Sequence, residues 1–115
     1  MKNVALAILL LPALSFADGI KNDREFDKYL ADYAKRSAKY QICGEYDTAD
    51  VANVGIYFDE ILSPSYLKQQ IKKYGTQDKA ANAAMNKVQK LSTMHQHRMV
   101  DKGVPMGMCQ KLLQE

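Results

Sequence analysis

The stretch 23-DREFDKYLADYAKRSAKYQIC-43 decides the fold. Its apolar and small residues recur at steps of three and four, the spacing of one face of an α-helix. These residues are Phe26, Tyr29, Leu30, Tyr33, Ser37, Tyr40 and Cys43. Asn22 or Asp23 can cap the start of such a helix, and Gly44 can take the left-handed conformation that ends one. The spacing therefore predicts one long amphipathic helix that ends on a cysteine.

The chain has only two cysteines, Cys43 and Cys109, which are 66 positions apart. Two cysteines in a short exported chain indicate a disulfide, because exported proteins meet an oxidising environment. Closing a loop of this length stabilises a domain by about 4 kcal/mol in the chain-entropy model. We therefore predict a Cys43–Cys109 bond that links the first helix to the C-terminal segment. Two free thiols that bind a soft metal are the alternative interpretation.

Residues 1–17 have the layout of a secretory signal peptide. Lys2 precedes an apolar run at residues 4–11, and small residues allow cleavage after Ala17. An uncleaved anchor is the alternative, but the run is much shorter than the roughly 20 residues that a membrane span needs. Cleavage would remove 17 of the 115 residues and leave 98. We expect residues 18–115 to form a single helical domain that is periplasmic or secreted.

Residues 51–62 are the ambiguous part of the chain. Their apolar residues follow helical spacing, although residues 54–58 also suit a strand. We predict a helix because the pattern extends over more than ten residues. Gly55 would then allow a neighbouring element to approach closely.

Local signals mark the helices that follow. Ser63 and Pro64 begin a helix over residues 64–74, with Leu67, Ile71 and Tyr74 on its apolar side and Gly75 at its end. Thr76 can cap a helix over residues 77–101, whose expected inward face is Ala81, Ala84, Val88, Leu91, His95 and Arg98 or Met99. A last short helix is predicted over residues 106–113. The sequence thus predicts an all-α, compact bundle of four to five helices after the signal peptide, linked by one disulfide.

Methionine and histidine are concentrated near the C-terminus. Thioether and imidazole groups together suit Cu(I), so His95, Met99, Met106 and Met108 form a candidate copper site. The spacing opposes it, because His95 and His97 are two positions apart and point to different faces of a helix. The alternative interpretation is that the methionines fill core gaps, with His95 half-buried and His97 solvated.

The chain lacks the common motifs of catalysis. It contains no G-x-S-x-G, H-E-x-x-H, C-x-x-C or C-x-x-C-H sequence and no glycine-rich phosphate loop. Without the leader the net charge falls from +3 to +2, which is too small to indicate nucleic-acid binding. We expect a protein that is not an enzyme, has no cofactor and, once mature, does not span a membrane.

The seven tyrosines indicate a protein-binding surface. Tyrosine is enriched at protein interfaces, because its ring packs while its hydroxyl meets water or a partner. Tyr46 and Tyr66 fall at a turn and a helix start, so we predict that Tyr46, Ser63 and Tyr66 contact a partner protein. The alternative is that the helical tyrosines lie at the rim of the core.

In its leader, size, helicity and cysteine near each end of the mature domain, the chain resembles small periplasmic immunity proteins that neutralise secreted, cell-wall-cutting toxins. The resemblance implies an exported, non-enzymatic protein-binding module, possessing an inhibitor or immunity role. No family motif assigns functional residues. A periplasmic Cu(I)-binding protein and an envelope assembly factor, such as a pilotin-like chaperone, are the two alternatives.

Overall fold

The computed structural model describes residues 19–45, 49–103 and 109–111. Within these residues lie five helices and one further helical turn at 109–111. The helices are α2 (Asp23–Ile42), α3 (Ala52–Ile56), α4 (Phe58–Ile61), α5 (Pro64–Tyr74) and α6 (Gln77–Asp101). The described part contains no β-strand, so the all-α prediction is confirmed. Residues 1–17 lie outside the described residues, and the signal peptide stays a prediction.

Helix α2 has the caps that its sequence predicts. The Asn22 side chain accepts a hydrogen bond from the backbone N–H of Glu25 at 2.9 Å. Cys43 is the C-cap, and Gly44 follows with a φ of +81°. Both ends of the helix are therefore set by local chemistry.

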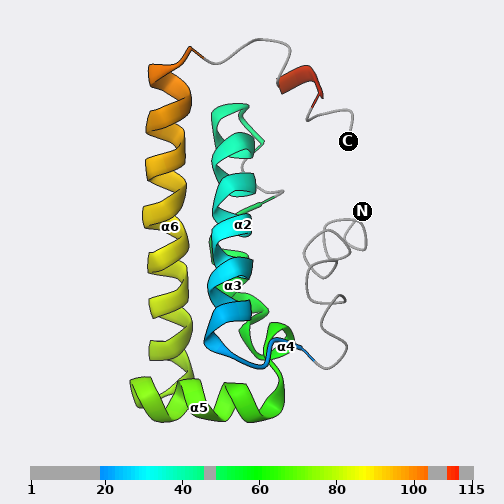
Figure 1. Ribbon diagram of the computed structural model, residues 1–115, viewed down its shortest axis with the longest axis vertical. Helices are drawn as coiled ribbons and strands as arrows, with labels where there is room; N and C mark the ends of the chain where they lie inside the picture. Colours follow the sequence, from blue (N-terminus) through cyan, green and yellow to red (C-terminus); the bar gives the residue numbers. More distant parts are fainter. Residues whose placement is uncertain (1–18, 46–48, 104–108, 112–115) are drawn as a thin grey trace.

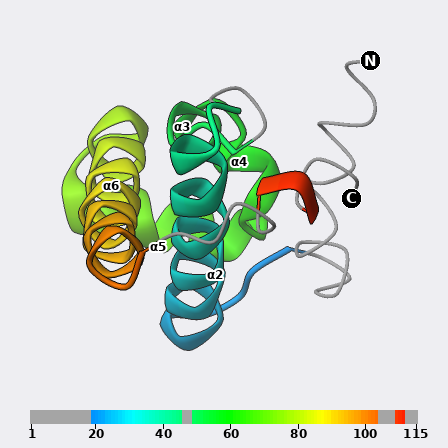
Figure 2. The same ribbon diagram turned by 90° about the horizontal axis from the view of Figure 1, so that it is seen from above.

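Helices α2 and α6 lie side by side and run in the same direction (Figures 1 and 2). Asp27 meets Lys87 near their beginnings, and Gln41 meets Gln96 near their ends. After α2 the chain runs back through α3 and α4, which flank α2, and α5 crosses beneath both long helices (Figure 1). Helix α5 therefore connects α4 to α6 across one end of the bundle.

The core fills the space between α2, α6 and the short helices. Helix α2 contributes Phe26, Tyr29, Leu30, Tyr33 and Ala34, and α6 contributes Ala80, Ala81, Ala84 and Val88. Short alanine side chains on α6 let the aromatic face of α2 pack closely against it. The ring of Phe26 makes edge contacts with Phe58 and Tyr66, 6.1 and 5.7 Å between centroids.

Residues 51–62 are helical, but they form two short helices where the sequence predicted one. The break lies at Tyr57, with φ −103° and ψ 20°. A Cβ on Gly55 would lie 2.6 Å from Sδ of Met85, so the expected close approach at this glycine is confirmed. The break lets α3 pack against α6 while Phe58 of α4 meets Phe26 of α2.

A backbone pairing between Ile20 and Leu62 is absent from the sequence prediction. Ile20, three positions before the start of α2, is completely buried. Its N–H donates to the carbonyl of Ile61 at 3.0 Å, and its carbonyl accepts from the N–H of Ser63 at 2.9 Å. This parallel bridge joins the start of the described chain to the link between α4 and α5.

The Cys43–Cys109 disulfide is confirmed, with 5.4 Å between the two Cα atoms. It joins the end of α2 to the helical turn at residues 109–111. That turn is the described part of the helix predicted over residues 106–113, whose remaining residues lie outside the described ranges.

Candidate functional site

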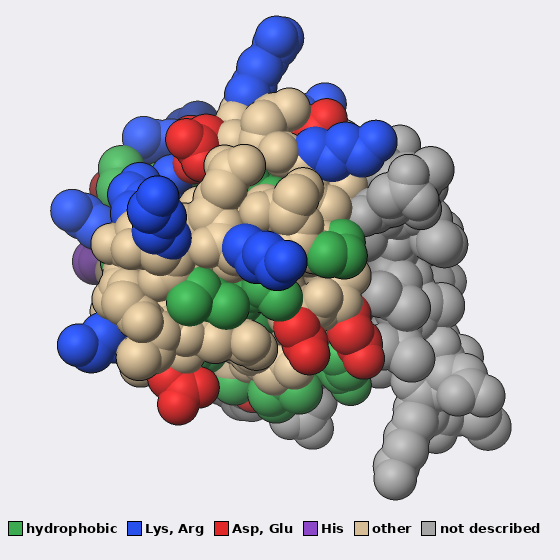
Figure 3. Space-filling model, turned by 90° about the horizontal axis from the view of Figure 1, so that it is seen from below, with side chains coloured by type: hydrophobic (Ala, Val, Ile, Leu, Met, Phe, Trp, Pro, Cys, Tyr) green, Lys and Arg blue, Asp and Glu red, His purple; other side chains and the backbone are tan. Residues whose placement is uncertain are grey.

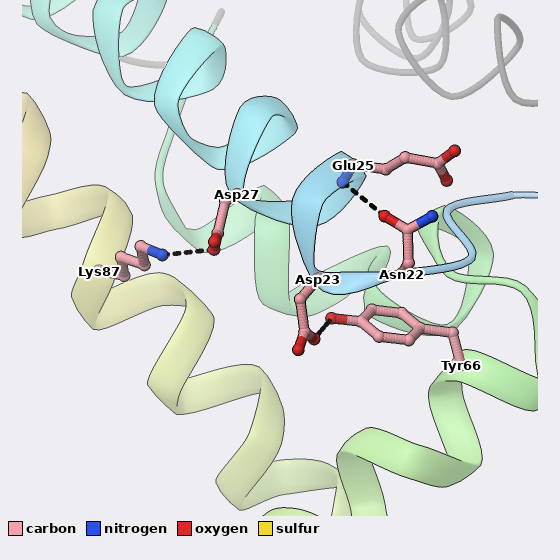
Figure 4. A network of polar contacts seen from close by, with 6 residues as sticks. All are labelled: Asn22, Asp23, Glu25, Asp27, Tyr66 and Lys87. Carbon is pink, nitrogen blue, oxygen red and sulfur yellow. Dashed lines mark hydrogen bonds and ion pairs between the residues drawn. The ribbon is translucent and has the colours of Figure 1, made fainter.

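Ser63 and Tyr66, two of the three predicted partner-binding residues, are buried inside the molecule. Ser63 caps α5, its Oγ accepting from the N–H of Tyr66 at 3.3 Å. Tyr66 is 1% exposed, and its hydroxyl donates to the carboxylate of Asp23 on α2 (Figure 4). Both are buried because the first turn of α5 packs beneath the start of α2. Tyr46 lies outside the described residues, and a role of the three in partner binding stays a prediction that this burial does not favour.

The inward face of α5 is therefore one residue away from the predicted one. Tyr66 and Gln70 are buried, whereas Leu67 and Ile71 are half-buried and Tyr74 is exposed. Hydrophobicity alone indicated Leu67, Ile71 and Tyr74. The aromatic cluster with Phe26 and the hydrogen bond to Asp23 turn the tyrosine inward instead.

His95 and Met99 lie together at the opposite end of the molecule, near Cys43. They line a hollow of about 320 Å³ between α2 and α6, which we call the cationic cleft. Its lining is Lys35, Lys39, His95, Arg98, Met99 and Lys102. His97 and Met94 are exposed beside it. The expectation of a half-buried His95 and a solvated His97 is confirmed.

The cationic cleft carries positive charge that described acids do not neutralise. Lys35, Lys39, Arg98 and Lys102 form no ion pair with any carboxylate in the described part of the chain. Burial, with the charges of Arg98 and Lys35, lowers the pKa of His95 below its ordinary value of 6.5. Its surroundings therefore favour the neutral imidazole, and the lysine and arginine side chains dominate the charge of the cleft.

The cationic cleft is a poor place for Cu(I). Four positive side chains repel a metal cation, and Cys109 is already bonded to Cys43. Within the described ranges no three His, Cys, Asp or Glu side chains gather where they could hold an ion. Met106 and Met108 lie outside the described residues, so only His95 and Met99 of the predicted copper ligands are seen together.

Tyr29 differs from the buried Tyr33 and Tyr66, whose hydroxyls both make hydrogen bonds. The hydroxyl of Tyr33 donates to the carbonyl of Asp50 at 2.7 Å, and burial above all raises its pKa to about 12. The hydroxyl of Tyr29 is buried without any hydrogen-bond partner among the described residues. Burial, followed by the neighbouring Tyr33, also raises the pKa of Tyr29. Tyr29 and Tyr33 therefore belong to the core, as the alternative interpretation of the tyrosines predicts.

No protein-family model, no curated protein and no solved structure matches this chain. Among the described residues, no helix combines the length and apolar character needed to cross a membrane. The surface of the protein is therefore the basis for assigning its function.

Proposed function

We propose that this chain is a small exported, non-enzymatic protein that binds another protein through the cationic cleft. The observation that carries the proposal is the set of four cations around one hollow, held by α2, α6 and the C-cap of α6, none of which pairs with a described carboxylate. Such a surface attracts an acidic patch or segment of a partner. Complementary charge speeds association and selects the partner.

The proposed compartment is the periplasm or the medium. The leader-like residues 1–17 favour export. The Cys43–Cys109 bond supports the same destination, because disulfides persist in oxidising compartments and are rare in the cytosol. The bond also holds the end of α2 close to the helical turn at residues 109–111.

A binding role fits the chemistry of the cleft better than catalysis does. Among the described residues that line it, only His95 titrates near neutral pH, and none is a carboxylate that could orient the imidazole or share its proton. Lysine and arginine side chains can instead form charge-assisted hydrogen bonds to a partner's carboxylates. Within this proposal, the finer role is that of an immunity or inhibitor protein.

An envelope assembly factor would use the same kind of surface, so the partner distinguishes the two roles. The oxidised mature protein is used to capture partners from its own organism's envelope. The affinity of the recovered partner is then measured by calorimetry at low and high salt. We expect binding that weakens with salt and, for an inhibitor, loss of the partner's enzymatic activity on binding.

A pair of charge-matched variants tests the cleft itself. Lys39→Gln with Lys102→Gln removes two charges from the cleft, and Lys68→Gln with Lys72→Gln removes two exposed charges from α5. The first variant should slow association and lower the affinity, while the second should bind like the wild type. Equal binding by both would reject the cleft as the contact surface. Failure to capture any partner would count against a protein-binding role.

A further inference from the structure

A second hollow lies at the other end of the molecule, where α2, α5 and α6 meet. It has a volume of about 260 Å³, and we call it the corner cavity. Its inner wall is buried and consists of Phe26, Leu30, Tyr66, Gln70, Ala80 and Ala84. The cavity exists because the first turns of α6 carry alanines there, and larger side chains would fill the space.

Gln70 is the unexplained group in this wall. The residue is only 5% exposed, and its amide, which makes no hydrogen bond to any described residue, reaches the surface of the cavity. A buried amide has two donors and an acceptor that need partners. Because Gln70 lines the corner cavity, water or a ligand in the cavity can supply those partners.

The rim of the corner cavity carries charges of both signs. Asp23 and Asp27 come from α2, Lys73 from α5 and Lys87 from α6. Figure 4 shows Asp27 pointing to Lys87, 2.6 Å away, and Asp23 pointing to Tyr66. One carboxylate oxygen of each aspartate is engaged in these contacts, and the other makes no hydrogen bond or ion pair to a described residue. Positive and negative side chains also alternate over this face of the molecule (Figure 3).

We propose that the corner cavity binds a small zwitterion of the free α-amino acid class. The ammonium group lies against these remaining carboxylate oxygens of Asp23 and Asp27. The carboxylate of the ligand meets Lys73, which stands 5.4 Å from the ring centre of Tyr74. The amide of Gln70 bonds the ligand from below. A cavity near the lower end of ordinary ligand-site volumes admits a molecule of this size and little more.

This site is separate from the cationic cleft, and its ligand is independent of the proposed partner. Calorimetry on the oxidised mature protein tests it with alanine and glutamine as probes. Methylamine and acetate, which each carry one of the two charges, are the controls. We expect saturable binding of an amino acid and no saturable binding of either half. Equal binding of acetate alone, or no saturable binding of either amino acid at millimolar concentration, would overturn the proposal.

Matched variants locate the binding. Gln70→Met keeps the shape but removes the amide, and Gln69→Met makes the same change on the exposed side of α5. Lys73→Met and Lys72→Met form a second pair, since only Lys73 lines the cavity. We expect Gln70→Met and Lys73→Met each to weaken binding about tenfold, the effect of one buried hydrogen bond or charge contact. The two controls should bind normally.

Nuclear magnetic resonance of the wild-type protein gives a readout that does not depend on how the variants fold. The side-chain amide signal of Gln70 should shift on titration with the amino acid, together with residues at the start of α6. Shifts confined to other parts of the molecule, or unchanged affinity in a folded Gln70→Met variant, would contradict the proposal.

Discussion

The hydroxyl of Tyr66 donates a hydrogen bond to Oδ1 of Asp23, 43 positions earlier in the chain. The bond fixes the start of α5 against the start of α2. We expect Tyr66→Phe to lower the free energy of unfolding by about 1–2 kcal/mol, because a bond to a charged acceptor is lost. Urea unfolding of the oxidised protein measures this. Tyr74→Phe, on the exposed side of α5, is the control and should change little.

Replacing Tyr29 by phenylalanine should not destabilise the protein as Tyr66→Phe does. Its buried hydroxyl lacks a partner in the described part of the chain, so it is desolvated without compensation. Tyr29→Phe removes that group and should leave stability unchanged or raise it by about 1 kcal/mol. The same urea experiment checks it. A loss as large as that of Tyr66→Phe would mean that the Tyr29 hydroxyl has a partner in solution.

Gly19 occupies a position that only glycine fits. Its φ is +89°, and a Cβ would lie 2.7 Å from the backbone nitrogen of Ser63. Gly44 also has a positive φ, of +81°, but has open space around it. Gly44→Ala should therefore cost about 1–2 kcal/mol from backbone strain alone. Gly19→Ala should cost about 2–4 kcal/mol, since the clash adds to the strain. If Gly19→Ala and Gly44→Ala lost equal unfolding free energy, the backbone around the Ile20–Leu62 pairing would be able to shift and avoid the clash.

The disulfide should contribute a large part of the stability. It closes a loop of 66 positions, for which the chain-entropy model gives about 4 kcal/mol. We expect the double variant Cys43→Ser, Cys109→Ser to lose an amount near this value in urea unfolding. Reduction of the wild type should give the same result. A loss below about 1 kcal/mol would indicate a reduced chain that already keeps its ends together.

His95 makes stability depend on mildly acidic pH. Burial, with Arg98 and Lys35, lowers its pKa in the folded protein below 6.5, its ordinary value. As the pH falls below about 6.5, the unfolded chain takes up the proton first, so the free energy of unfolding decreases. Above that pH the imidazole is largely neutral in both states, so His95 no longer makes the free energy of unfolding depend on pH. His95→Gln should flatten this part of the curve, and the exposed His97→Gln serves as control. Equal curves for wild type and His95→Gln would contradict the assignment.

Local chemistry explains why the limits of α5 and α6 were predictable. Ser63 and Thr76 each cap a helix through bonds to a backbone N–H three residues ahead, and Gly75 ends α5 with a φ of +99°. Each of these interactions joins residues only a few positions apart, so the local sequence is enough to predict where the helices begin and end. The inward face of α2 follows from periodicity in the same way.

The rest depends on partners distant in the sequence. Ile20 is buried because it pairs with the backbone around Leu62, and Tyr66 is buried because it meets Phe26 and Asp23. Neither contact leaves a local pattern. The cationic cleft was also missed, because its lysines and arginine come from two helices 50 or more positions apart. Only His95 and Met99 drew attention to it, and they did so as metal ligands.

The covalent link between Cys43 and Cys109 also determines how the chain can be pulled apart. Residues 43–109 form a closed ring, so a force applied to the two termini bypasses everything within it. About 220 Å of contour length is sheltered in this way. A motor that threads single polypeptides through a narrow pore would stall at the ring until a reductant opened it.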